Sequence, residues 1–154
     1  MDNNYSCLFR YNYAANKRII EALDNSGPPE KALQLMAHVL QAHHVWIKRI
    51  AAPGQPSLNP WSAIAPHTFN KHNEALLQQS LDIAHQHDDT YELTYYNTKG
   101  QQFCNKLADI YLHLVNHATY HRGQIALLLR LENIDPPVTD YIAYVTEKKN
   151  RPMV

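Results

Sequence analysis

The stretch Asn116–Gln124, with the sequence NHATYHRGQ, places two histidines four residues apart in a segment that reads as a helix. Positions i and i+4 lie one above the other on the same helix face, so His117 and His121 are expected side by side. The apolar residues that share this stripe are Ile110, Leu114, Ile125 and Leu128. The two imidazoles are therefore predicted to point inward. Buried imidazoles are costly unless they are satisfied, and one metal ion bound by both would satisfy them.

Three further segments have the same helical periodicity, which gives four predicted helices at about 5–25, 29–52, 66–87 and 103–133. Gly27 is expected to end the first helix, and Pro29 is a favoured first-turn residue for the second. The second and fourth segments are apolar over a wide arc, which is wider than a single core seam requires. Long amphipathic helices of this number predict a four-helix bundle.

The connections between the helices complete the predicted fold. Residues 91–100, YELTYYNTKG, are rich in aromatic and β-favouring residues and end in a turn signal. They predict a short strand or small hairpin before the last long helix. The proline-rich residues 53–66 are interpreted as a long ordered crossover and not as a linker between domains. The expected fold is therefore all-α, a four-helix bundle with a long crossover, in one domain over residues 1–154.

Composition excludes several classes of partner. The chain has 14 basic and 14 acidic residues, so no basic excess favours nucleic acid. The apolar runs are shorter than the roughly 18–20 residues that span a bilayer. Residues 1–6 lack the basic and apolar regions of a signal peptide. These features predict a cytoplasmic protein without nucleic-acid or membrane partners.

A metal site needs a third ligand, and ten histidines offer several candidates. His113 extends the ladder below His117 and His121, but three rungs on one straight helix span about 12 Å, too far for one tetrahedral ion. His43 and His44 are adjacent and point about 100° apart, so they cannot act together. The histidines near helix ends or in polar surroundings, expected at the surface, are His67, His72, His85 and His87.

His38 differs from these because it lies in the middle of a predicted helix, on an apolar stripe. The other members of that stripe are Leu35, Ala42 and Val45. A lone histidine in such a place is more often a satisfied core residue than a ligand. Because His117 and His121 also point inward in the same small domain, a ligand role is favoured here, and His38 is predicted as the third ligand beside them.

The residues around the pair bear on the chemistry. No carboxylate lies between the two histidines, which disfavours a protease-like mechanism with a glutamate base and favours thiol transfer, in which the metal itself activates the nucleophile. Gln124 and Asn116 are candidates to hydrogen-bond a ligand imidazole. Arg122 is a candidate to bind an anionic group, although a structural pairing with Asp140 or Asp109 is preferred. The aromatic residues predicted to pack in the bundle, and less favoured as pocket walls, are Trp46 and Tyr120.

Residues 117–124, HATYHRGQ, resemble the HxxxHRGQ signature of the DinB / YfiT-like family of metal-binding helical bundles. Weaker likenesses follow in the expected order at residues 8–13, 38–49, 96–100 and 135–141. One departure is that Ala14 stands where a tryptophan is common in the first helix, which leaves the metal ligands untouched and alters the expected shape of the pocket or core.

The resemblance implies a four-helix bundle with one long crossover and a three-histidine site for a divalent metal, at the matching positions His38, His117 and His121. It also implies frequent homodimers. Some relatives use bacillithiol or mycothiol as the attacking thiol in S-transfer or isomerisation. Zinc and nickel both suit imidazole ligands. The resulting hypothesis is a metal-dependent S-transferase that joins a low-molecular-weight thiol to an electrophilic small molecule. The alternatives are a metal-dependent hydrolase, a non-catalytic metal-binding stress-response protein, and a purely structural bundle. No catalytic residue beyond the ligands is predicted.

Overall fold

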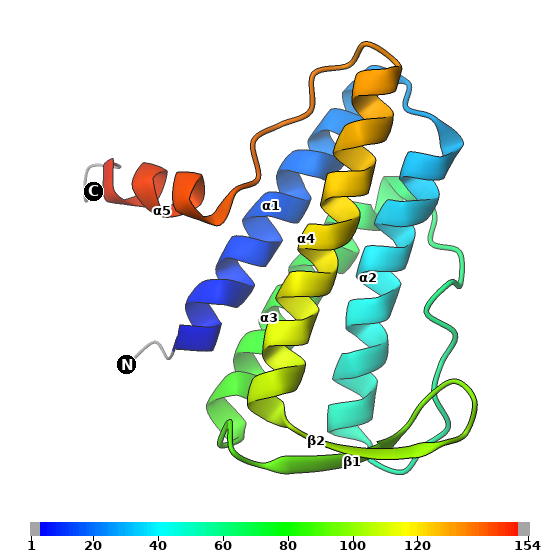
Figure 1. Ribbon diagram of the computed structural model, residues 1–154, viewed down its shortest axis with the longest axis vertical. Coiled ribbons are helices and arrows are strands. Elements are labelled where there is room, and N and C mark those ends of the chain that lie inside the picture. The colour runs from blue at the N-terminus through cyan, green and yellow to red at the C-terminus, as the bar shows by residue number, and fades with distance from the viewer. Residues whose placement is uncertain (1–3, 151–154) are drawn as a thin grey trace.

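The computed structural model of the protein describes residues 4–150, and its four long helices form a bundle (Figure 1). These helices are α1 (Asn4–Ser26), α2 (Glu30–Ala51), α3 (Phe69–Gln86) and α4 (Leu107–Leu131). Helix α1 packs between α3 and α4, and α2 packs between the same two helices from the opposite corner. One hydrophobic core therefore runs through all four helices. The predicted four-helix bundle with a small hairpin is confirmed.

Helix directions explain the long crossover. In Figure 1, α1 and α4 run upward, whereas α2 and α3 both run downward. Since α2 has 22 residues, the chain must return by about 33 Å before α3 can begin. Residues 52–65 reach at most about 50 Å when fully extended, so they have little spare length and must run along the bundle. A short 3₁₀-helix, Pro66–Thr68, then leads into α3. This path carries the crossover past the middle of α2.

Two helix boundaries follow from special residues. Gly27 has a φ of +60°, a left-handed conformation that glycine adopts without steric cost, and α1 ends immediately before it. Pro29 precedes α2 as its N-cap residue, with extended backbone angles. Its fixed φ suits a helix start. These positions agree with the predicted ends of the first two helices to within a residue or two.

The hairpin consists of β1 (Glu92–Tyr96) and β2 (Gln102–Lys106), which pair antiparallel with Tyr95 opposite Phe103. It crosses the lower end of the bundle (Figure 1). The prediction that the last long helix begins near Phe103 is wrong, because residues 102–106 use their backbone groups to pair with β1. Helix α4 begins only at Leu107, a fully buried residue.

A further helix, α5 (Tyr141–Asn150), was not predicted and lies beside α1 (Figure 1). The Tyr11 hydroxyl donates to the Thr139 carbonyl at 2.7 Å, and its ring lies 5.0 Å from that of Tyr141. No residue of α5 is buried. Within residues 4–150, none of the helices combines the length and apolar character that a membrane span requires.

Candidate metal centre

Three histidines from two helices meet in the interior of the bundle. His38 lies in the middle of α2, and His117 and His121 lie one turn apart on α4. One ring nitrogen from each falls within 4.8 Å of the other two. The Nε2 atoms of His117 and His121 are 3.2 Å apart. Ligand atoms about 2.0–2.1 Å from a tetrahedral ion are separated by about 3.4 Å, so this pair already has a suitable spacing.

Hydrogen bonds to the outer ring nitrogens orient two of the three imidazoles. His38 donates from Nδ1 to the carbonyl oxygen of Pro60 at 2.9 Å. His121 donates from Nδ1 to the side-chain oxygen of Gln124 at 2.7 Å. A neutral imidazole carries one proton, so a proton on Nδ1 leaves the Nε2 lone pair available. Such partners hold histidine ligands in the correct tautomer and orientation. The donor set therefore fits a divalent metal on grounds of hydrogen bonding as well as proximity.

Trp61 covers one side of the cluster. Its ring stacks on the ring of His38 at 3.6 Å between centroids with an interplanar angle of 10°, and its other edge is open to solvent. The Lys31 ammonium lies 5.9 Å from the centroid of the Trp61 ring. Neither Pro60 nor Trp61 was predicted as part of the site. A signal for them was present in the sequence, because a tryptophan lies within a proline-rich connection that was expected to be ordered.

A cavity of about 420 Å³ adjoins His38 and Trp61. Its walls are the first half of α2 and the crossover residues that follow Trp61. Apolar lining residues include Leu33, Ala37 and Ile64. This volume lies within the roughly 300–1,000 Å³ of small-molecule sites. The cluster is therefore bordered by space of substrate size.

Burial disfavours protonation of two of the three imidazoles, His117 and His38. It lowers the pKa of His117 to about 3, with smaller contributions from His121 and His38. Burial also lowers the pKa of His38, although the Pro60 carbonyl opposes that change. Metal ligation requires unprotonated imidazole, so these shifts favour binding. Among residues 4–150 no carboxylate, cysteine or further histidine joins the group. Three neutral ligands leave the positive charge of a bound ion uncompensated.

Among the described residues, the other histidines do not join this group. His113 is exposed, with its ring 5.5 Å from those of His117 and Trp46. His43 is buried and donates from Nε2 to the Ser80 hydroxyl at 2.8 Å, since that hydroxyl itself donates to the Leu76 carbonyl. The histidines predicted at the surface are His67, His72, His85 and His87; the first three are exposed and the last is half-buried.

Arg122 joins two helices inside the bundle, in line with the structural role that the sequence favoured over anion binding, but the predicted acidic partners are wrong. Its side chain is only 1 % exposed and donates to Asn12 at 2.6 Å and to Asn16 at 2.7 Å. Asp109 and Asp140 are exposed and take no part in these bonds. The guanidinium points from α4 into α1, on the side of the helix away from solvent, where two neutral amides meet it.

The remaining predicted residues differ in their surroundings. Asn116 is exposed, and none of the hydrogen bonds found between described residues joins it to a ligand histidine. Tyr120 was expected to pack in the bundle, which is wrong, because it is 65 % exposed on the outer face of α4. Trp46 is half-buried and packs edge-on against Tyr95 at 4.9 Å, with the guanidinium of Arg49 4.4 Å from its ring.

Comparison with known proteins gives one result. The model of the DinB family matches residues 1–151, which is nearly the whole chain. No curated protein and no solved structure matches the chain.

Proposed function

The chain belongs to the DinB family, and on that premise we propose that it binds a divalent metal, zinc or nickel, and transfers a low-molecular-weight thiol to an electrophilic small molecule. The observation that carries the proposal is the cluster of His38, His117 and His121 beside a cavity of about 420 Å³. A site of three histidines with a remaining open position is typical of catalytic metal centres. A low-molecular-weight thiol is a cytoplasmic reagent, so the proposal places the protein in the cytoplasm.

A bound divalent ion would lower the pKa of a thiol in its remaining position, which yields the thiolate at neutral pH. In the transfer, the sulfur forms a bond to the electrophilic carbon, the leaving group departs with the bonding electron pair, and the thiol proton passes to solvent. The side chains contribute orientation: Gln124 holds His121, and the Pro60 carbonyl holds His38. Trp61 shields one face of His38 from water.

The alternatives have less support. Hydrolysis requires a base to activate water, and no carboxylate lies in the histidine group among the described residues. A non-catalytic metal store favours a closed site with four protein ligands, whereas the group contains three. The non-catalytic metal store remains an outcome of the experiment below.

The test uses zinc- or nickel-loaded protein with bacillithiol or mycothiol and monochlorobimane, an electrophile that fluoresces once it is conjugated to a thiol. We expect metal-dependent conjugation above the uncatalysed rate, lost in His38→Ala and retained in His67→Ala, which alters an exposed histidine. Metal-loaded protein that never exceeds the uncatalysed rate would contradict the transferase and favour a non-catalytic metal protein.

We also propose that the protein forms a homodimer through the outer face of α4. Tyr120, Leu127 and Leu131 recur on this face at spacings of seven and four residues, and all three are more than half exposed. Contiguous exposed apolar side chains often mark a contact with another protein. Light scattering should give the mass of two chains, and Leu127→Glu should give one. A monomeric mass for the unmodified protein would contradict the proposal.

A further inference from the structure

A second cavity, of about 470 Å³, lies between α1, α3 and the C-terminal helix α5. Its lining shares no residue with the histidine cluster or with the cavity beside His38. Its volume also falls in the range of small-molecule sites. Nothing in the proposed thiol transfer uses this space.

The cavity owes its depth to a small residue. Ala14 faces it from α1, where a larger side chain would occupy the space, and Leu77 contributes an apolar surface from α3. Tyr13 and Tyr144 line it from α1 and α5. Tyrosine combines a flat apolar ring with a polar end, which suits it to contact an aromatic ligand.

Positive charge gathers around this cavity, although the whole chain has equal numbers of basic and acidic residues. The lining contains two carboxylates, Glu21 and Glu147, and four cationic side chains, which are Arg10, Lys17, Arg18 and Lys148. The Lys17–Glu21 pair is 3.8 Å apart with both side chains about half exposed, so that pair is weak. A surplus of cations in a cleft attracts anions, and arginine presents a planar array of donors that matches a carboxylate or sulfonate.

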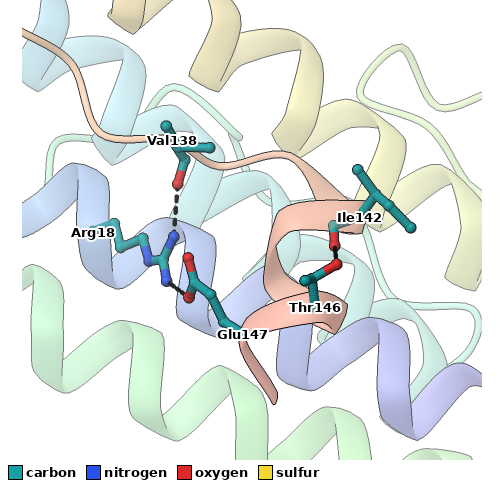
Figure 2. Close-up of polar contacts among 5 residues, drawn as sticks. All are labelled: Arg18, Val138, Ile142, Thr146 and Glu147. Atoms are coloured by element: carbon teal, nitrogen blue, oxygen red, sulfur yellow. Dashed lines mark hydrogen bonds and ion pairs between the residues drawn. The ribbon is translucent and has the colours of Figure 1, made fainter. Parts of the chain in front are cut away.

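The wall that α5 supplies is held in place by Arg18 (Figure 2). The Arg18 guanidinium donates to the Val138 carbonyl at 2.8 Å and pairs with Glu147. These contacts fix both ends of the segment that carries Tyr144. The wall that carries Tyr144 is therefore linked to α1 at two points.

We propose that this cleft is a second binding site, for a small aromatic anion that carries a carboxylate or sulfonate. The aromatic part of the ligand lies between Tyr13 and Tyr144, above Ala14. The anionic group faces Arg10 and Lys148 at the rim. The proposal does not depend on thiol transfer, because the two sites share no residue.

The probe is 8-anilinonaphthalene-1-sulfonate, an aromatic sulfonate whose fluorescence rises in apolar surroundings. Titration should show saturable binding with one site per chain. Ala14→Trp fills the cavity and should abolish this binding. Arg10→Gln removes one cation and should weaken binding about tenfold, as expected for a hydrogen bond to a charged group. Ala63→Trp, in the cavity beside His38, is the matched control and should leave binding unchanged.

The neutral analogue N-phenyl-1-naphthylamine tests the charge directly and should bind at least tenfold more weakly than the sulfonate. Circular dichroism establishes that each variant is folded, and Arg10→Gln alone decides if Ala14→Trp does not fold. The proposal is overturned by any of three results: no saturable binding, unchanged affinity in Arg10→Gln, or equal affinity for the neutral analogue.

Discussion

Replacing Arg122 by methionine should destabilise the bundle severely while leaving the metal ligands in place. Arg122 is 1 % exposed, and its guanidinium donates to Asn12, Asn16 and the Thr119 hydroxyl at 2.6–2.9 Å. Burial lowers the pKa of Arg122, yet arginine remains charged at neutral pH. The contacts join α4 to α1, and a further bond from Asn16 to Asn73 at 3.2 Å extends the network to α3.

The magnitude follows from what the substitution leaves behind. Methionine is of similar length and fills most of the space, so cavity formation contributes little. The side-chain oxygens of Asn12 and Asn16 both lose their donor in the interior. An orphaned buried polar group costs about 1–3 kcal/mol. Removing the buried charge relieves part of this cost, so we expect a loss of about 3 kcal/mol in the free energy of unfolding.

The assay is urea unfolding followed by circular dichroism, with a chelator present so that bound metal does not add to stability. Arg130→Met, on the exposed face of the same helix, is the control and should change stability by less than about 0.5 kcal/mol. Folded Arg122→Met should still take up one metal ion per chain. A loss of stability equal to that of the control would refute the structural role assigned to the guanidinium.

Three further outcomes are expected. Gln124→Leu removes the oxygen that accepts the hydrogen bond from His121 Nδ1, so it should weaken zinc binding about 10- to 100-fold in competition titrations. Gln124→Glu keeps an acceptor oxygen and should preserve the affinity. Equal zinc affinities for the two variants would contradict the orienting role of Gln124. Burial lowers the pKa of His43 to about 4 in the folded protein, so between pH 6.5 and 4 this imidazole is protonated in the unfolded chain and not in the folded one. The free energy of unfolding should therefore fall by about 3 kcal/mol as the pH decreases across that range. In urea unfolding, the free energy of unfolding of His43→Gln should depend less steeply on pH across that range. The same pH dependence in the variant and the unmodified protein would contradict the role of His43. Zinc affinity should fall as the pH is lowered, but mainly well below pH 6.5, because burial lowers the pKa of both His38 and His117; a steep loss of affinity already between about pH 7.5 and 6.5 would contradict these lowered pKa values.

Helical periodicity located the four long helices because each one buries an apolar stripe, which appears in the sequence as apolar residues at helical spacing. The same reasoning failed where no stripe exists. Helix α5 has no buried residue, so its sequence carries no periodic signal. It failed again at residues 102–106, because strand pairing with β1 depends on backbone groups that side-chain patterns do not report.

The candidate site divides in the same way. His38, His117 and His121 were identified because each is a polar residue on an apolar helix face, and the structure brings them together. Pro60 and Trp61 were missed because the path of a crossover depends on which way α3 runs. The partners of Arg122 were assigned to acids, although a signal was present: Asn12 and Asn16 form a polar i, i+4 pair on the apolar face of α1.

The central claim is that His38, His117 and His121 hold one divalent metal ion. Elemental analysis of protein purified without an affinity tag tests it most directly, beside His38→Ala, His117→Ala and the surface control His67→Ala. The account predicts one divalent ion per chain, lost in the first two variants and retained in the third. A folded protein that contains no metal, and takes up none when zinc or nickel is added, would contradict it.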